Sequence, residues 1–184
     1  ESAGPMYPIR IRSIYALLAL NAVDGDKRTE AQRRLLGILS ERPSGYRILR
    51  RLYLDSSHFP SLHSIPQPVR WSLADAALAD GDMDSASRLL HDLDTAPEGT
   101  RRVMWQLRRA KVFILAADYD SAKTLLSRLV AKAGELERGD VDRLMQLLFD
   151  LQTVGEHEAA YEMFGRLGAR AEGQFKRELP YWMA

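Results

Sequence analysis

The sequence predicts an all-α fold in which antiparallel helix pairs stack into a right-handed superhelix, or solenoid. The first observation is a six-residue turn segment that occurs three times, beginning at positions 81, 117 and 155, so that its copies lie 36 and 38 residues apart. The second is that apolar residues follow each copy at the same offsets: Leu89, Leu90 and Leu93; Leu125, Leu126 and Leu129; Met163, Phe164 and Leu167. The third is that the stretches before the copies carry apolar residues at helical spacing. Two-helix units of this length are typical of helical repeat proteins.

The first well-marked unit pairs a helix over residues 69–79 with a helix over residues 84–93. Pro68 precedes the first helix and would end any earlier one, because the residue before a proline is pushed out of helical geometry. The turn lies at Gly81-Asp82. The carboxylate of Asp82 or Asp84 is expected to cap the second helix by accepting a hydrogen bond from a free backbone N–H group.

The next two units follow the same plan. The second begins at Thr100, an expected N-cap residue, and carries an apolar stripe through Val103, Leu107 and Ala110. A loop is predicted over residues 134–139. The helices of the two units are predicted over residues 100–116, 120–132, 140–153 and 158–169.

The ends of the chain are less regular. Residues 1–67 are expected to form either one or two divergent repeats or an unrelated helical cap, and both would cover the exposed end of a stack. Within them, helices are predicted over residues 9–23, 29–40 and 46–54, with an extended loop at residues 55–67. Residues 68–173 hold the three clear units. Residues 174–184 are expected to begin a further helix of a longer native protein, with Pro180 at an early helical position.

The turn segment Ala117-Asp118-Tyr119-Asp120-Ser121-Ala122 resembles the turn of the tetratricopeptide repeat, a unit of about 34 residues with a Gly-Asp-Tyr-x-x-Ala stretch. Ala86, Ala122 and Ala160 stand where that family places the small residue of its second helix. The small residue of the first helix aligns with Ala74 and Ala110, but with Leu148 in the third unit. The resemblance covers residues 69–169 well and 9–54 weakly. It implies a degenerate bacterial array whose first helices line a concave face and which acts as a scaffold or adaptor.

Composition excludes several classes of protein. The 184 residues carry a formal net charge of +1, which argues against bulk attraction to nucleic acid or to anionic lipid. The absence of cysteine excludes disulfides, thiolate nucleophiles and cysteine-based zinc sites. No apolar run reaches the roughly 20 residues that span a bilayer. The arginine-rich composition is typical of a GC-rich bacterial genome. Composition fixes no compartment; a bacterial cytoplasm or periplasm is expected, with the periplasm favoured.

No motif for catalysis or cofactor binding is present, so the sequence predicts neither an enzyme nor a cofactor. The acidic pairs at the turns recur in successive units, which favours capping over acid–base catalysis. His58 and His63 share one loop without a third ligand nearby, so loop histidines are favoured over a metal site. An enzyme with its site in the 55–67 loop is kept as a hypothesis.

Arginine clusters are the candidate binding residues. The positions expected to contact a partner are Tyr46, Arg47 and Arg50, which have Arg51 and Tyr53 close by, and Arg101, Arg102, Arg108 and Arg109. The last four are spaced by seven residues in two pairs and are expected to form a stripe. In a concave groove this stripe would clamp an acidic peptide; otherwise it is a solvated face paired with local acids.

We therefore expect a non-catalytic protein–protein interaction scaffold, one section of a larger bacterial protein. The repeat resemblance adds an association with the envelope or with exopolysaccharide export. The alternative is an arginine-mediated binder of an acidic polymer or nucleic acid, which the near-neutral charge disfavours. Trp71, Trp105 and Trp182 lie near the starts of predicted first helices and are expected to pack between units.

Overall fold

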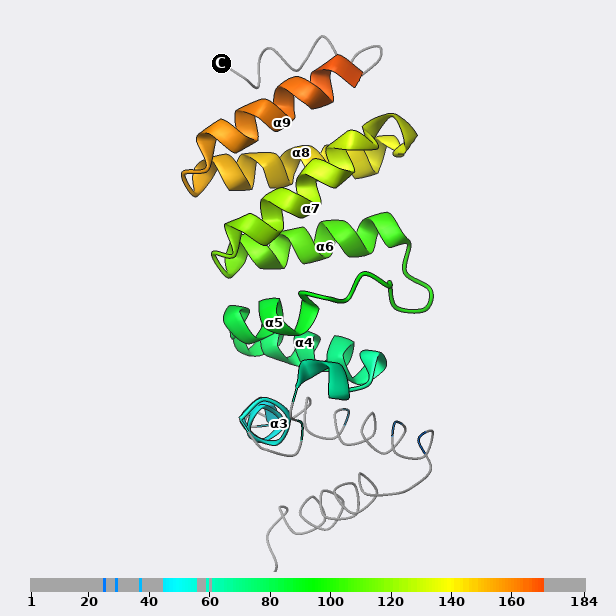
Figure 1. Cartoon of the computed structure of the whole chain (residues 1–184), viewed down its shortest axis with the longest axis vertical. Coiled ribbons are helices and arrows are strands. Elements are labelled where there is room, and N and C mark those ends of the chain that lie inside the picture. Colours follow the sequence, from blue (N-terminus) through cyan, green and yellow to red (C-terminus); the bar gives the residue numbers. More distant parts are fainter. Residues whose placement is uncertain are drawn as a thin grey trace, which may run out of the picture. The chain divides into compact units, whose positions relative to one another are not determined.

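The computed structural model describes residues 45–55, 59 and 61–170, together with the single residues 25, 29 and 37 (Figure 1). This part of the chain forms seven α-helices and contains no strand, which confirms the all-α prediction. The helix predicted over residues 9–23, nearly all of the one predicted over 29–40, and the helix start predicted at 174–184 lie outside the described residues.

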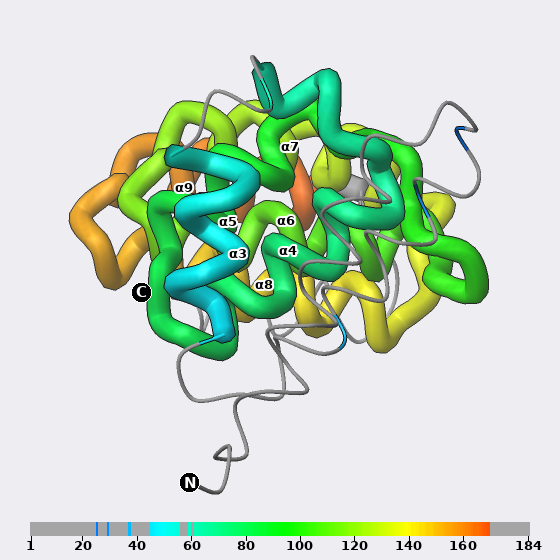
Figure 2. Tube along the Cα trace, turned by 90° about the horizontal axis from the view of Figure 1, so that it is seen from below, coloured from blue at the N-terminus to red at the C-terminus, as the bar shows by residue number. Residues whose placement is uncertain are grey.

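Contacts divide the chain into two compact units, Glu1–Leu90 and His91–Ala184. The first unit contains α3 (Gly45–Tyr53), the 3₁₀ helix η1 (Leu62–Ser64), α4 (Gln67–Asp80) and α5 (Met83–Leu90). The second contains α6 (Arg102–Leu115), α7 (Tyr119–Ala131), the 3₁₀ helix η2 (Ala133–Glu135), α8 (Arg138–Thr153) and α9 (His157–Arg170). The helix predicted over 46–54 is thus present as α3, and it lies beside α4 (Figure 2).

The three turn segments have the same backbone geometry. The first residue of each copy is left-handed, with φ of 81° at Gly81, 57° at Ala117 and 99° at Gly155. The next N–H group bonds back to the carbonyl five residues earlier, as from Asp82 to Ala77 at 2.9 Å and from Asp118 to Phe113 at 2.9 Å. This is the hydrogen bond that closes a helix at a left-handed residue. The turn segment therefore ends one helix and starts the next within two or three residues.

Two of the three turns are capped by the predicted carboxylate. Asp82 Oδ1 accepts a hydrogen bond from the Ser85 N–H group at 3.1 Å, and Asp118 Oδ1 accepts one from the Ser121 N–H group at 3.3 Å. The longer Glu156 side chain instead accepts from the Lys123 ammonium at 3.1 Å. The acidic residues at the first two turns thus act as N-caps, which favours a structural role for them over a catalytic one.

The core repeats at the predicted offsets. Ala86, Ala122 and Ala160 are completely buried. The small-residue positions of the first helices, occupied by Ala74, Ala110 and Leu148, are buried as well. The apolar residues that follow the turns are also buried in all three units: Leu89, Leu90 and Leu93; Leu125, Leu126 and Leu129; Met163, Phe164 and Leu167. Each helical hairpin therefore buries one face of both helices, and small alanines allow the two helices to pack closely.

In the second compact unit, which begins at His91, the two helical hairpins pack with first helix against first helix and second helix against second helix. The first helices, α6 and α8, contact each other, and so do the second helices, α7 and α9. Several side chains that touch across these pairs stand 39 residues apart in sequence, as in Lys111 with Asp150 and Ser127 with Arg166. The recurrence of this separation on both helix pairs indicates that the second hairpin repeats the first in orientation and register.

Several predicted boundaries were wrong. Arg101, not Thr100, is the N-cap residue of α6, and its side chain makes no capping hydrogen bond. The helix predicted over 84–93 ends at Leu90 as α5. The loop predicted over residues 134–139 overlaps η2 and includes the first two residues of α8, and the loop predicted over 55–67 contains η1 and the first residue of α4. The two predicted loops thus include short helical segments that their polar and glycine residues did not indicate.

The tryptophans differ in their surroundings. Trp105 is buried, and its indole N–H group donates to the Leu93 carbonyl at 2.7 Å, which confirms its predicted packing role. Trp71 is half-buried in α4, and Trp182 lies outside the described residues.

Candidate functional site

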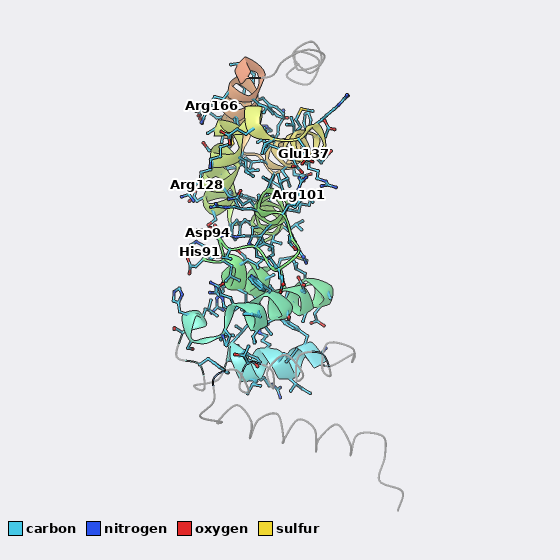
Figure 3. The ribbon with its side chains drawn as sticks, turned by 90° about the vertical axis from the view of Figure 1, so that its right-hand side faces the viewer. His91, Asp94, Arg101, Arg128, Glu137 and Arg166 are labelled. Carbon is cyan, nitrogen blue, oxygen red and sulfur yellow. The ribbon has the colours of Figure 1, made fainter. Side chains whose placement is uncertain are left out.

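Arg101 links α6 to α8, the first helices of the two hairpins in the second compact unit. It precedes α6, and its guanidinium donates to the carboxylates of Glu137, which precedes α8, and Asp140, which lies in the first turn of α8 (Figure 3). Asp140 is buried. The hydrogen bond to Glu137 and the nearby negative charges raise the pKa of Arg101 above its ordinary value. Arg101 therefore already has two acidic partners within the protein.

Arg109 lies inside the protein and is only 3% exposed. Its guanidinium donates to the carboxylate of Asp94 at 2.5 Å and to the carbonyl of His91, and its central carbon lies 5.6 Å from the centre of the Phe113 ring. Trp105, one turn earlier in α6, bonds to the Leu93 carbonyl of the same turn. Together the two side chains fasten residues 91–94 onto α6, so Arg109 has a structural role.

The expected stripe of four arginines is thus divided. Arg102 and Arg108 are exposed, Arg101 is paired with α8, and Arg109 is buried. Residues seven apart share a helix face, but what covers that face changes along α6. Arg102 lies at the first residue of the helix, whereas Arg109 lies beneath the 91–94 turn. Reversing the charge of Arg109 would place a carboxylate beside Asp94 and disturb the fold, so it cannot test binding.

The arginine and tyrosine cluster of α3 is also engaged. The Tyr46 hydroxyl donates to Asp82 Oδ2 at 2.6 Å, and Arg50 donates to the same oxygen at 3.0 Å. Burial and the hydrogen bond to Asp82 raise the pKa of Tyr46 to about 12. Burial alone would raise the pKa of Asp82, but the hydrogen bonds from Tyr46 and Ser85 and the Arg50 charge outweigh it, so this pKa is lowered. Tyr46 and Arg50 thus hold α3 to the turn between α4 and α5.

Arg47 is exposed on α3. Of the seven candidate binding residues, Arg47, Arg102 and Arg108 are exposed. Arg47 belongs to the first compact unit and the other two to the second, so they are considered separately.

A second set of exposed or partly exposed residues lies beside Arg108 in the second compact unit. We define the α6–α8 face by Met104, Arg108, Lys111 and Leu115 on α6, Arg143 and Asp150 on α8, and Val154, the C-cap residue of α8. Leu115 is 52% exposed and Val154 is 40% exposed. Lys111 donates to Asp150 at 2.7 Å, and Arg143 contacts the sulfur of Met104.

This face carries three basic side chains and one acidic one. Lys111 donates to Asp150, Arg143 lies 3.9 Å from the buried Asp140, and Arg108 is exposed. The face therefore combines exposed guanidinium groups with apolar side chains. Sequence reasoning missed Leu115 and Val154. The two residues stand 39 positions apart, the same separation as Lys111 and Asp150, so an alignment of α6 with α8 at this offset would have paired them.

The opposite side of the second unit carries a different arginine pair. Arg128 on α7 and Arg166 on α9 lie away from Arg101 and Glu137 (Figure 3). Arg166 donates to the Ser127 hydroxyl at 2.9 Å and lies 3.6 Å from Glu162. Arg128 is exposed, which makes it a useful control residue for binding experiments.

Among the residues that the structure describes, the remaining chemical candidates do not gather into a site. His63 is exposed in η1, and His58 lies outside the described residues. No group of three potential metal ligands occurs in the part of the chain that the structure describes. The same residues include no helix with the length and apolar character needed to cross a bilayer.

Comparison with protein-family models, with curated proteins and with solved structures gives no match to this chain.

Proposed function

We propose that this protein is a non-catalytic scaffold of the tetratricopeptide-like kind, and that it binds a segment of another protein on the α6–α8 face. Two observations support the repeat assignment. All three turn segments have the same hydrogen bonds and left-handed first residue. In the second unit, side chains 39 residues apart touch along both pairs of like helices.

The observation that carries the binding proposal is the composition of the α6–α8 face. Leu115 and Val154 expose apolar surface at the ends of α6 and α8, where polar side chains would be expected on a purely solvated face. Arg108 and Arg143 add guanidinium groups, which bind carboxylates with two parallel hydrogen bonds. A partner segment with acidic residues beside apolar ones fits this combination. Association with the envelope or with exopolysaccharide export is a proposal that rests on the repeat resemblance alone.

The test begins with the full chain as bait and the identification of what co-purifies from bacterial extract. The dissociation constant of the recovered partner is then measured for Arg108→Glu, and separately for Leu115→Asp. We expect each variant to weaken binding at least ~10-fold, about 1.4 kcal/mol, while circular dichroism and thermal unfolding stay unchanged. The matched control is Arg128→Glu, which changes an exposed arginine on the other side of the unit.

Two results would contradict the proposal. Equal affinities for the α6 variants and the Arg128→Glu control would mean that this face is only solvated. Binding of single-stranded RNA or another polyanion, with an affinity that falls steeply as salt increases and does not depend on Leu115, would favour the acidic-polymer alternative.

A further inference from the structure

One face of α9 is exposed along its whole length. Glu158, Tyr161, Glu162, Gly165 and Ala169 are all exposed, and their spacing places them on a single side of the helix. Tyr161 is 63% exposed, more than any other large apolar side chain among the described residues. The centre of this α9 face thus consists of the Tyr161 ring beside Gly165, which has no side chain.

The repeat register shows what this face corresponds to in the preceding hairpin. Tyr161 and Gly165 stand 38 residues after Lys123 and Ser127 of α7. In α7 these positions contact the next hairpin: Lys123 donates to Glu156 at 3.1 Å, and Ser127 accepts from Arg166 at 2.9 Å. The α9 face is therefore the counterpart of a face that α7 uses to hold another helix.

We propose that the α9 face binds the same face of a second copy of this chain, with the two helices antiparallel across a two-fold axis near Gly165. Residues 161, 165 and 169 form one ridge, spaced by four residues. A two-fold axis at Gly165 sets Tyr161 of each copy against Ala169 of the other and lets the helices approach closely at the two glycines. The ridge is thus complementary to itself in size, which a two-fold interface requires.

The charges on α9 favour the same arrangement. Glu158 and Glu162 lie in the first half of the helix, whereas Arg166 lies in the second half. Antiparallel pairing brings the acidic half of one helix toward the basic half of the other, and parallel pairing would oppose like charges. A single helix pair buries less surface than a standard stable interface, so this is a weak dimer.

The experiment measures the weight-average mass of the full chain by sedimentation from about 10 µM to about 1 mM, the range expected for a small interface. We expect the mass to rise from 20.8 kDa toward that of a dimer. Gly165→Leu should lower the association constant at least tenfold while raising the melting temperature. A Cβ at this position meets no atom within 4 Å, and glycine weakens a helix, so the substitution harms only the close approach of two copies. Tyr161→Lys, which places at this position the residue type of its α7 counterpart Lys123, should also lower the association constant.

The matched control is Gly139→Leu, because Gly139 is an exposed glycine of α8 whose Cβ position is equally open. This variant should dimerise like the original chain. A mass that stays at 20.8 kDa over the whole range would overturn the proposal. Self-association that Gly165→Leu and Tyr161→Lys leave unchanged would also overturn the proposal. So would a monomer that both substitutions destabilise, because the α9 face would then be covered by another part of the same chain.

Discussion

Replacing Arg109 by methionine tests whether the buried arginine of α6 stabilises the fold rather than binds a partner. Methionine keeps most of the aliphatic stem, so the substitution mainly removes the guanidinium group. That group donates to the His91 carbonyl and to Asp94, and it lies over the Phe113 ring. Arg108 is the matched control, because it is the preceding residue of the same helix and is exposed.

The magnitude follows from the three contacts. A carbonyl that loses its donor costs about 1–3 kcal/mol, and the value here lies at the low end because the His91 site is only partly buried. The contact between the cation and the ring adds about 0.5–1 kcal/mol. The ion pair adds little, because Asp94 has a side chain that is 67% exposed and returns to water. The sum is about 2 kcal/mol for Arg109→Met, against less than about 0.5 kcal/mol for Arg108→Met.

Equilibrium unfolding in urea, followed by circular dichroism, measures both values. A loss of about 2 kcal/mol in an ordinary small unit lowers the melting temperature by roughly 10 °C, so a thermal scan checks the same result. Equal stability of the two variants, or a loss below about 0.5 kcal/mol for Arg109→Met, would refute the structural role of Arg109. A loss confined to partner binding, with unfolding unchanged, would restore the stripe as an interface.

Three further predictions concern the turns, the core and the pH dependence. Ala117→Gly should raise the free energy of unfolding by about 1 kcal/mol, because Ala117 adopts a φ of 57° that glycine reaches without strain; Ala116→Gly, in an ordinary conformation, should not, and equal effects in urea unfolding would contradict the strain. Ala122→Trp should destabilise the protein by about 3 kcal/mol or more by overpacking a completely buried position on α7, while Thr124→Trp, exposed on the same helix, should cost less than about 0.5 kcal/mol; an unchanged melting temperature for Ala122→Trp would sink the repeat alignment. The pKa of Tyr46 is raised from 10.0 to about 12, so the unfolded chain ionises first and stability should fall as pH rises from about 10 to 12; Tyr46→Phe should make that fall shallower, and a pH profile identical to that of the original chain would show that Tyr46 is not protected by folding.

The helical hairpins could be predicted from sequence because their determinants are local. Gly81 and Gly155 mark positions where the chain needs a left-handed residue, and the acidic residue that follows is well placed to cap the next helix. The same segment at Ala117 was recognisable only because it repeats, since alanine by itself does not indicate a left-handed turn. Repetition also identified the buried alanines, of which Ala122 and Ala160 are completely buried.

The candidate site could be predicted only in part. The spacing of Arg101, Arg102, Arg108 and Arg109 predicted a stripe along one helix, but spacing carries no information about which segments cover each position. The 91–94 turn covers Arg109, and the acidic start of α8 engages Arg101. Tyr46 was predicted as a contact residue, yet the carboxylate that it bonds lies 36 residues away in sequence.

By itself, then, the sequence determined where the helices turn and which apolar residues form the core, because these depend on residue type and on short spacings that recur. Tertiary structure alone decided which polar side chains are already engaged and which remain at the surface. The reason is physical: the partners of Tyr46, Arg101 and Arg109 stand 15 to 39 residues away, and only packing of one helix against another brings them within hydrogen-bonding distance. The same packing leaves Leu115, Val154 and Tyr161 exposed, and these residues define the two surfaces proposed to bind other molecules.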